Sequence, residues 1–277
     1  AARPLPNSLL TRSKSVPAVR HRELPYNDYQ RQPLLPWKHS QLGPGIAVGD
    51  IDRDGDDDIF IGGASGQAGT LLVNDGTFQS QPVGPWDDDA DCEDTGVLFF
   101  DADGDGDLDL YVASGGVECE PGDDVLADRL YLNDGRGEFS RAPEDALPAA
   151  RVSSSAVAAA DYDRDGDLDL FVGGRIIPGQ YPLAAKSMLL RNDGRTFHDA
   201  TAEAASELRN TGLVTGAVWS DADNDGWIDL LVTHEWGPVK LYRNDQGRLV
   251  ERTGSARLAD RLGWWNGIAS GDVDNDG

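Results

Sequence analysis

The sequence of 277 residues is poor in cysteine, in basic residues and in long apolar runs. It has two cysteines, and 24 Lys and Arg stand against 49 Asp and Glu, for a formal net charge of −25. No apolar stretch approaches the roughly 18 residues of a membrane-spanning helix, so we expect no membrane span. Nucleic-acid binding depends on Lys and Arg that neutralise phosphates, so we expect no nucleic-acid partner either.

What the chain has in abundance is one acidic motif, Asp-x-Asp-x-Asp-Gly-x-x-Asp, which occurs four times and begins a fifth time. Its first positions are separated by 51, 60, 60 and 51 residues, a spacing typical of a repeated supersecondary unit. Positions 1, 3, 5, 7 and 9 of the copies are Asp50, Asp52, Asp54, Asp56 and Asp58; Asp101, Asp103, Asp105, Asp107 and Asp109; Asp161, Asp163, Asp165, Asp167 and Asp169; Asp221, Asp223, Asp225, Trp227 and Asp229; and, in the incomplete fifth copy, Asp272, Asp274 and Asp276.

This spacing suits Ca²⁺, which takes six to eight oxygen ligands at about 2.3–2.6 Å. Carboxylates at positions 1, 3 and 5 of a tight loop converge on one point, position 7 offers a backbone carbonyl, and position 9 closes the shell. Glycine at position 6 permits the sharp turn. One copy alone could equally be a solvated turn, but four crowded sets of carboxylates disfavour the folded loops unless a cation is present. We therefore predict about four calcium sites and an incomplete fifth.

The EF-hand is the first alternative for such a loop, and it fails at position 12. An EF-hand needs a bidentate glutamate there and a helix on each side. The four complete copies instead have Ile61, Val112, Val172 and Val232. Short apolar runs precede and follow each loop, which predicts a β-hairpin with the acidic loop as its turn.

A second landmark recurs after each hairpin, and with it the chain predicts an all-β fold. Asn-Asp-Gly at 74–76, 133–135 and 192–194 lies between an apolar run and Phe78, Phe139 or Phe197, which is typical of a hairpin turn. Four antiparallel strands per repeat form one blade of a β-propeller, whereas a sandwich explains the period poorly. We predict four complete blades and a truncated fifth, whose first strand covers 268–270, within residues 43–277. Residues 1–42, rich in proline and basic side chains, are expected to form a linker or strap.

The segment at 45–64, GIAVGDIDRDGDDDIFIGGA, resembles the FG-GAP (VCBS) repeat of integrin α-subunit propellers. Leu34-Leu35-Pro36, the Ser-Gln-Leu-Gly-Pro at 40–44 and the Gly-Trp-Trp-Asn at 263–266 are similar to secreted bacterial FG-GAP proteins of the ASPIC/UnbV and cartilage acidic protein group. The resemblance covers 26–277. It implies a seven-bladed parent propeller with calcium held by the aspartates named above. The fourth copy departs at 233–235, where Thr-His-Glu replaces Gly-Gly. The absence of an initial Met and the cut fifth motif suggest a fragment.

Strand alternation places the acidic loops on one rim of this propeller and the connections between second and third strands on the other. The first Asp and the Asn of Asn-Asp are 24, 32, 31 and 23 residues apart, so insertions collect opposite the acidic loops. Loops on a rigid scaffold are common recognition sites. The candidate ligand face there comprises Arg175, Tyr181, His234, Glu235, Trp236, Trp264 and Trp265. Burial of these side chains between blades is the alternative, and of the two tandem tryptophans we expect at most one to be free.

We expect a calcium-stabilised, non-catalytic scaffold that recognises a protein or a carbohydrate. A polysaccharide lyase or hydrolase is the alternative, with His234 and Glu235 as its acid/base pair, although His-Glu-x-x-His, Gly-x-Ser-x-Gly and P-loop motifs are absent. A purely structural module of a larger secreted protein is a third interpretation.

Cys92 and Cys119 flank the second acidic loop almost symmetrically. An antiparallel hairpin folded at that loop would bring them nearly opposite each other, so we predict a disulfide, with two unpaired thiols as the alternative. A disulfide and weak calcium loops both point to an extracellular, cell-surface or periplasmic location.

Overall fold

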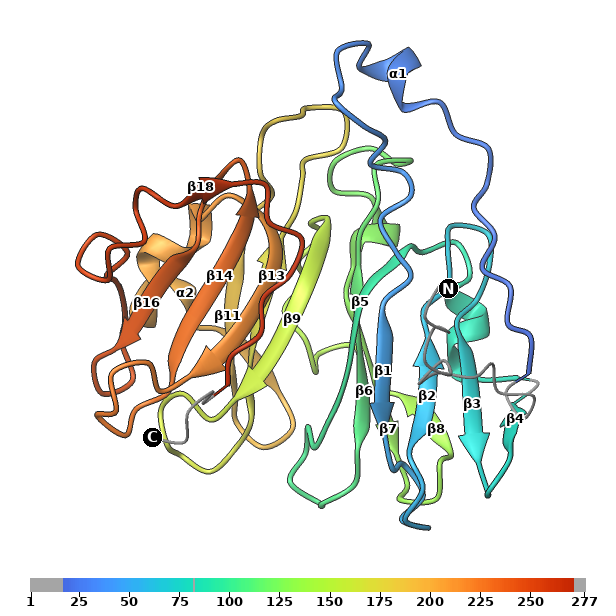
Figure 1. Ribbon diagram of the computed structural model, residues 1–277. Helices are drawn as coiled ribbons and strands as arrows, with labels where there is room; N and C mark the ends of the chain where they lie inside the picture. Colours follow the sequence, from blue (N-terminus) through green and yellow to red (C-terminus); the bar gives the residue numbers. More distant parts are fainter. Residues whose placement is uncertain (1–16, 82, 272–277) are drawn as a thin grey trace, which may run out of the picture.

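The computed structural model describes residues 17–81 and 83–271 and contains four four-stranded antiparallel sheets, one for each complete acidic repeat (Figure 1). The strands of each sheet follow one another in chain order, as two consecutive hairpins require. They are β1 (Ile46–Gly49), β2 (Asp58–Ile61), β3 (Thr70–Asn74) and β4 (Phe78–Ser80); β5 (Asp94–Phe100), β6 (Asp109–Ser114), β7 (Arg129–Asn133) and β8 (Phe139–Arg141); β9 (Ser154–Ala160), β10 (Asp169–Gly174), β11 (Met188–Asn192) and β12 (Phe197–Asp199); and β13 (Leu213–Ser220), β14 (Asp229–Glu235), β16 (Lys240–Asn244) and β17 (Leu249–Glu251).

The remaining elements are short and lie in the connections. They are α1 (Asp28–Arg31), α2 (Thr201–Ala204), the 3₁₀ turns η1 (Pro85–Asp89), η2 (Asp124–Leu126) and η3 (Ser206–Asn210), and the two-residue strands β15 (Gly237–Pro238) and β18 (Leu262–Gly263), which pair with each other. Among the described residues, no helix is long and apolar enough to cross a membrane.

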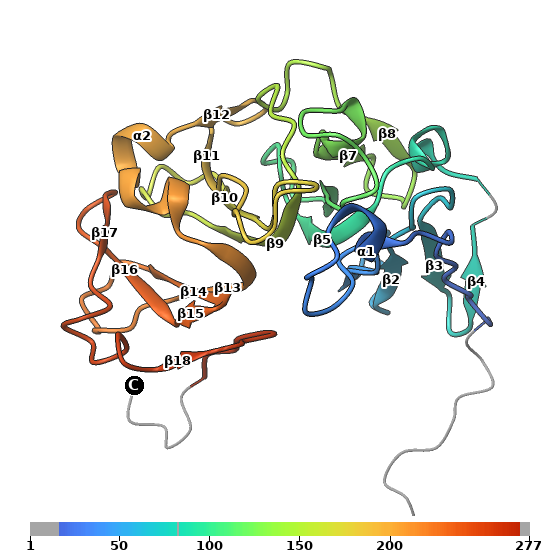
Figure 2. The same cartoon turned by 90° about the horizontal axis from the view of Figure 1, so that it is seen from above.

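The four sheets stand side by side in an arc (Figure 2). Their first strands, β1, β5, β9 and β13, contact one another in that order on the inner side, and the last strands lie outermost (Figure 2). Radial packing of four-stranded meanders is the architecture of a β-propeller. The predicted fold class is therefore confirmed, and we number the sheets blades 1 to 4 in chain order.

The hydrophobic core lies between blades rather than inside a single sheet. One cluster joins Phe60 of blade 1 to Leu110 of blade 2, a second joins blades 2 and 3, and a third joins Phe171 of blade 3 to Leu230 and Tyr242 of blade 4. Burying one such side chain contributes about 1.5–3 kcal/mol. Because both faces of the middle strands are covered, β6 and β10 are buried at every position.

An asparagine at the end of each third strand ties blades 2, 3 and 4 to the blade before. Its side-chain amide donates to the backbone carbonyl of the second residue in the preceding blade's acidic loop. The pairs are Asn133 with Ile51 at 2.8 Å, Asn192 with Ala102 at 2.8 Å, and Asn244 with Tyr162 at 2.7 Å. The sequence indicates these asparagines only as turn residues, so the link between blades is a finding of the structure.

The strap, residues 17–42, runs over the rim opposite the acidic loops (Figure 1). The Arg31 guanidinium donates to the backbone carbonyls of Val117 and Cys119. The buried Asp28 carboxylate accepts the backbone N–H groups of His39 and Ser40. Residues 1–16, the other part of the predicted linker, lie outside the described residues.

Cys92 and Cys119 are both free thiols, so the expected disulfide is not formed in this structure. The Glu93 carbonyl accepts the N–H of Gly115, and this register places Cys92 opposite Gly116. The chain then leaves the sheet at Gly116, where φ is +90°, and carries Cys119 away toward the strap. The estimate from the sequence took the hairpin to be symmetric about the acidic loop and misjudged the register by three residues.

The first strand expected for a fifth blade is also not formed. Residues 268–270 run as irregular chain, because a first strand needs the second strand after its acidic loop to complete a hairpin. The fifth motif, Asp272, Asp274 and Asp276, lies outside the described residues.

Candidate functional site

The four complete acidic motifs form the loops between the first and second strands of blades 1 to 4, and all lie on one rim (Figure 1). Each loop turns at its glycine, which has positive φ in every copy, from +86° to +103°. That backbone conformation is accessible to glycine at little cost. The loop places its aspartates on a common inner side.

The aspartate at position 9 closes each loop. Asp58, Asp109, Asp169 and Asp229 are at most 1% exposed. In blade 3, the Asp169 carboxylate accepts the N–H of Tyr162 at 3.1 Å with one oxygen and that of Asn192 at 2.9 Å with the other. The other three blades repeat this pattern. Position 9 therefore fastens the loop to the third strand, a role that the sequence did not reveal.

The aspartates at positions 1 and 3 keep oxygen atoms free at the centre of the loop. Asp161 Oδ2 accepts the N–H of Gly166 at 3.2 Å, whereas Oδ1 of Asp161 and Oδ1 of Asp163 are buried without a hydrogen-bond partner. Oδ1 of Asp50 in blade 1 is in the same situation. A buried carboxylate oxygen without a partner is costly, so these atoms have the arrangement expected of metal ligands.

The predicted metal-binding residues come together in at least three of the described loops. One ligand atom from each of positions 1, 3 and 9 lies within 4.8 Å of the others in the sets Asp50, Asp52 and Asp58; Asp101, Asp103 and Asp109; and Asp161, Asp163 and Asp169. An all-oxygen donor set of this kind fits Ca²⁺. The structure adds Asp75, from the Asn-Asp-Gly turn of blade 1, which forms a further group with Asp52 and Asp54.

The electrostatics of these loops favour a bound cation. Burial, reinforced by the nearby carboxylates of positions 3 and 5, raises the pKa of Asp109 and that of Asp169 to about 7. Burial likewise raises the pKa of Asp58 and that of Asp229. A dication would stabilise the ionised carboxylates, because opposite charge at short range favours the charged form.

The position-5 side chain of each loop accepts a hydrogen bond from the backbone N–H of position 7. Oδ1 of Asp54, Asp105, Asp165 and Asp225 accepts the N–H of Asp56, Asp107, Asp167 and Trp227, respectively, at 2.8–3.0 Å. Two position-7 side chains contact the preceding blade: Asp107 pairs with Arg53, and the Arg164 guanidinium lies 4.0 Å from the centre of the Trp227 ring.

The fourth loop differs in its charge balance. The Arg243 guanidinium lies 2.6 Å from Asp223 and 2.8 Å from Asp225 and lowers the pKa of Asp225. A protein cation therefore contacts positions 3 and 5 of the fourth loop together, whereas in the second loop Arg53 pairs with position 7.

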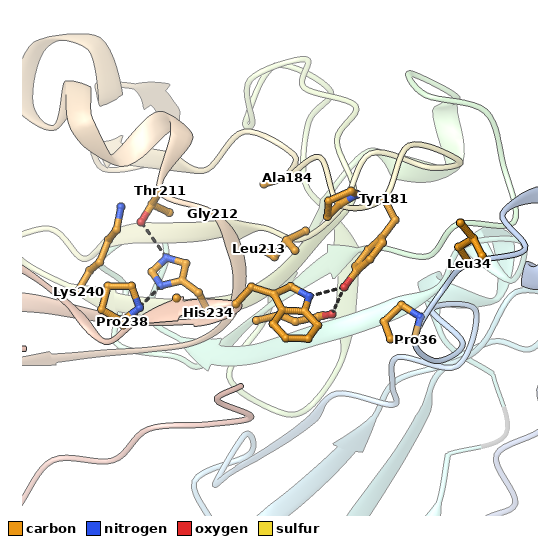
Figure 3. A pocket seen from close by; sticks show the side chains of 14 residues that line it. Leu34, Pro36, Tyr181, Ala184, Thr211, Gly212, Leu213, His234, Pro238 and Lys240 are labelled. Atoms are coloured by element: carbon orange, nitrogen blue, oxygen red, sulfur yellow. Dashed lines mark hydrogen bonds between the residues drawn. The ribbon is translucent and has the colours of Figure 1, made fainter. Parts of the chain in front are cut away.

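A groove of about 720 Å³ lies on the opposite rim, where the strap meets blades 3 and 4 (Figure 3). Leu34 and Pro36 of the strap line one side, Tyr181 of the long connection in blade 3 lies in the middle, and His234 and Lys240 of blade 4 line the other side (Figure 3). The insertion predicted between second and third strands thus contributes directly to a cavity.

Aromatic side chains from separate parts of the chain gather beside this groove. Trp236 is 60% exposed and Trp264 is 39% exposed, and their ring centres are 4.7 Å apart. Trp37 of the strap contacts Trp264 edge-on at 5.7 Å. The Trp265 indole instead donates to the Gly237 carbonyl at 3.0 Å, so the tandem tryptophans point in different directions and only Trp264 joins the exposed cluster.

Two residues of the candidate ligand face form a buried ion pair. The Arg175 guanidinium pairs with the Glu235 carboxylate, and the two side chains are 5% and 0% exposed. Glu235 Oε1 also accepts the Tyr181 hydroxyl at 2.8 Å and the Trp37 indole N–H at 3.3 Å. Burial lowers the pKa of Arg175 despite this partner. Glu235 therefore holds the strap and the blade 3 connection on blade 4.

His234 belongs to a buried hydrogen-bond chain. Because the Pro238 carbonyl can only accept, Nδ1 of His234 donates to it at 3.2 Å and Nε2 accepts from the Thr211 hydroxyl at 2.8 Å. The Tyr242 hydroxyl in turn donates to Thr211 Oγ1 at 2.7 Å. Burial lowers the pKa of His234 to about 4. His234 and Glu235 thus bind different partners, and the geometry does not join them as a cooperating acid and base.

The chain is similar in sequence to two curated proteins. Over 227 residues, 76% of the chain, the sequence is 28% identical to cartilage acidic protein 1 of Homo sapiens and of Mus musculus. The chain spans about one third of the length of these curated relatives, 32% and 33%.

Solved structures show weaker similarity. An Agrocybe aegerita lectin that recognises non-reducing terminal N-acetylglucosamine gives a TM-score of 0.46 at 19% identity, covering 73% of this chain and 49% of the lectin. The Dos1 propeller gives 0.41 at 9% identity, with coverages of 74% and 57%. The V. cholerae biofilm matrix protein Bap1 gives 0.32 at 16% identity, with coverages of 77% and 32%.

The FG-GAP-like repeat is the family whose sequence model matches the chain. The matched segments, residues 50–112, 120–172 and 221–277, together make up more than half of it. Each contains at least one complete acidic loop and at least the first residues of the strand that follows it. The chain belongs to the family of FG-GAP-like repeat β-propeller proteins.

Proposed function

We propose that this chain is a calcium-stabilised, non-catalytic recognition scaffold that works outside the cytoplasm, and that the groove between the strap and blades 3 and 4 receives its ligand. The observation that carries the proposal is the difference in side chains between the two rims of the propeller. One rim gathers carboxylates with buried, unpartnered oxygens. The other gathers exposed aromatic side chains around a groove.

Calcium is assigned a structural role in this proposal. Asp50, Asp52 and Asp58 would hold it in blade 1, and the matching residues would hold it in blades 2 and 3. Position 9 supports such a role, because the same buried carboxylate also fastens the loop to the third strand. Bound calcium would thus stabilise the blade itself. The fourth loop is a weaker site in this scheme, since Arg243 already neutralises two of its carboxylates.

The size of the groove suits a small carbohydrate or a small part of a protein surface. Trp236 and Trp264 offer ring faces, and aromatic rings with one apolar face and a polar edge are favoured at binding surfaces. Lys240 adds a positive charge at one end. Extracellular calcium modules in general bind calcium at about 0.1–1 mM, so we place the protein outside the cytoplasm, and the family resemblance implies a seven-bladed parent ring.

Binding to a glycan array and to a panel of purified extracellular glycoproteins tests the proposal. The calcium-loaded protein should bind a defined subset, and the double variant Trp236→Ala/Trp264→Ala should bind it at least tenfold more weakly. Trp227→Ala is the matched control, because it removes a tryptophan from the opposite rim. Equal loss in both variants, or unchanged binding in the double variant, would refute the assignment of the groove.

A polysaccharide-degrading enzyme remains the second candidate function, and one assay separates it from the first. Its candidate pair, His234 and Glu235, is buried and bound to Thr211 and Arg175, which favours structural roles for both. Release of products from acidic glycans that disappears in His234→Ala, while the variant keeps the wild-type thermal midpoint, would favour the enzyme.

A further inference from the structure

A cluster of one histidine and two glutamates lies apart from the acidic loops, where the strap crosses from blade 1 to blade 2. Single ligand atoms of His21, Glu23 and Glu93 lie within 4.8 Å of one another. The carboxylate of Glu118 also interacts electrostatically with Glu23 and Glu93. None of these residues belongs to a repeat motif.

Glu93 is held in place with one oxygen left free. The residue is 4% exposed. Its Oε2 accepts the N–H of Ser65 at 2.8 Å, which fixes the carboxylate, while Oε1 is buried without a partner. A fixed, buried carboxylate oxygen without a partner is costly, so its position indicates a missing ligand.

His21 shows the same combination of a fixed backbone and a free ring nitrogen. Gln67 holds the chain on both sides of it, since its amide donates to the Arg20 carbonyl at 3.0 Å and its oxygen accepts the N–H of Arg22 at 2.7 Å. Nε2 lies 2.7 Å from Glu23 Oε1, and Nδ1 is buried without a partner.

From this geometry we propose that His21, Glu23 and Glu93 bind a divalent transition metal ion of the Zn²⁺ class, which fastens the strap to blades 1 and 2. Such an ion gives the free Glu93 oxygen a partner and compensates the glutamate charges. Imidazole nitrogen is a preferred ligand of Zn²⁺ and its neighbours, whereas Ca²⁺ sites use oxygen. Three protein ligands leave a position for water or for Glu118, as in zinc sites with an open position. This site is chemically distinct from the acidic loops.

Metal titration in excess Ca²⁺ tests the proposal, because Ca²⁺ keeps the acidic loops filled. We expect the full chain to bind one equivalent of Zn²⁺ by calorimetry, and Co²⁺ in the same site to give visible absorption of a nitrogen-containing environment. His21→Ala and Glu93→Gln should each weaken Zn²⁺ binding at least tenfold. His198→Ala is the matched control, because His198 is exposed and 3.1 Å from a single carboxylate, Asp193.

Limited proteolysis gives a second readout that does not depend on the folding of any one variant. Trypsin cuts after Arg20 and Arg22, which flank His21, and Zn²⁺ should slow these cuts at least fivefold in the wild type and in His198→Ala. The protection should be absent in His21→Ala and Glu93→Gln. Wild-type Zn²⁺ binding in His21→Ala and Glu93→Gln, or no Zn²⁺-dependent protection in the wild type, would overturn the proposal.

Discussion

Replacing Glu235 by glutamine isolates the charge of the ion pair that joins blades 3 and 4 to the strap. Glutamine keeps the shape of the side chain, and its oxygen can still accept from Tyr181 and Trp37. Its amide group, however, faces the donors of Arg175. The guanidinium then stays buried, 5% exposed, without a counter-charge. Breaking such a buried pair costs about 3–5 kcal/mol.

Thermal unfolding in saturating Ca²⁺, followed by tryptophan fluorescence, measures this cost. Each kcal/mol shifts the midpoint of a protein of this size by about 2–4 °C, so Glu235→Gln should lower it by at least about 6 °C. The control is Glu251→Gln, because Glu251 is 3.6 Å from Lys240 in a pair whose side chains are 31% and 20% exposed. Exposed pairs contribute about 1 kcal/mol or less.

A second substitution completes the test. Adding Arg175→Met to Glu235→Gln removes the uncompensated charge, so the double variant should be more stable than Glu235→Gln alone. The structural role assigned to the pair would be wrong if the stability of Glu235→Gln lies within about 1 kcal/mol of the wild type, a threshold taken from exposed pairs. It would also be wrong if adding Arg175→Met restores no stability.

Three further predictions concern the blades and the loops. Asn192→Ala should cost about 2–3 kcal/mol, because it removes the donor to the buried carbonyl of Ala102 and to the partly buried carbonyl of Leu168. Asn74→Ala, whose amide contacts only its own blade at 3.3 Å, should cost less, and equal midpoints would contradict the link between blades. Chelation with EGTA should lower the wild-type midpoint and calcium should restore it, with a smaller restoration in Asp161→Asn; an unchanged wild-type midpoint would contradict calcium binding. Stability should fall between pH 6.5 and about 4, because the unfolded His234 takes up a proton there and the folded one, with its pKa at about 4, does not; a shift of this size corresponds to about 3 kcal/mol. His234→Gln lacks this contribution, so the difference in stability between wild type and variant, measured by urea titration, should change over that pH range; a parallel pH dependence of the two proteins would contradict it.

The repeat pattern predicted the blades well because the relevant signals are local. Apolar runs, an acidic loop and an Asn-Asp-Gly turn each determine a few residues of backbone, and together they place nearly every strand of blades 1 to 4. The failures involve contacts between distant segments or exact register. Cys92 lies opposite Gly116, and Cys119 follows three residues later, after the chain has left the sheet. No local sequence pattern specifies that exit.

The candidate sites divide in the same way. The clusters of aspartates in the acidic loops follow from spacing alone, whereas the proximity of Asp75 to Asp52 and Asp54 depends on how the second hairpin folds over the first. On the opposite rim, the sequence assigned the candidate residues to one face but could not separate exposed from buried ones. Trp236 and Trp264 are exposed, while Arg175, His234 and Glu235 are buried, because their partners come from the strap and from blade 3. No pattern in the sequence indicated that His21 and Glu93, which are 72 residues apart in the chain, lie close together.

The asparagine contacts between blades give the assembly a direction. Blades 2 to 4 each reach back to the acidic loop of the preceding blade, so a loop gains this second anchor only after the next blade has been added. In a chain of units coupled to nearest neighbours, stability then propagates along the array. Shortening the protein from its carboxyl end by one blade should therefore loosen the acidic loop of the new terminal blade and weaken its hold on a cation, while loops further back keep theirs. Assembly and ion retention are thus expected to advance together, blade by blade, as the chain emerges during synthesis.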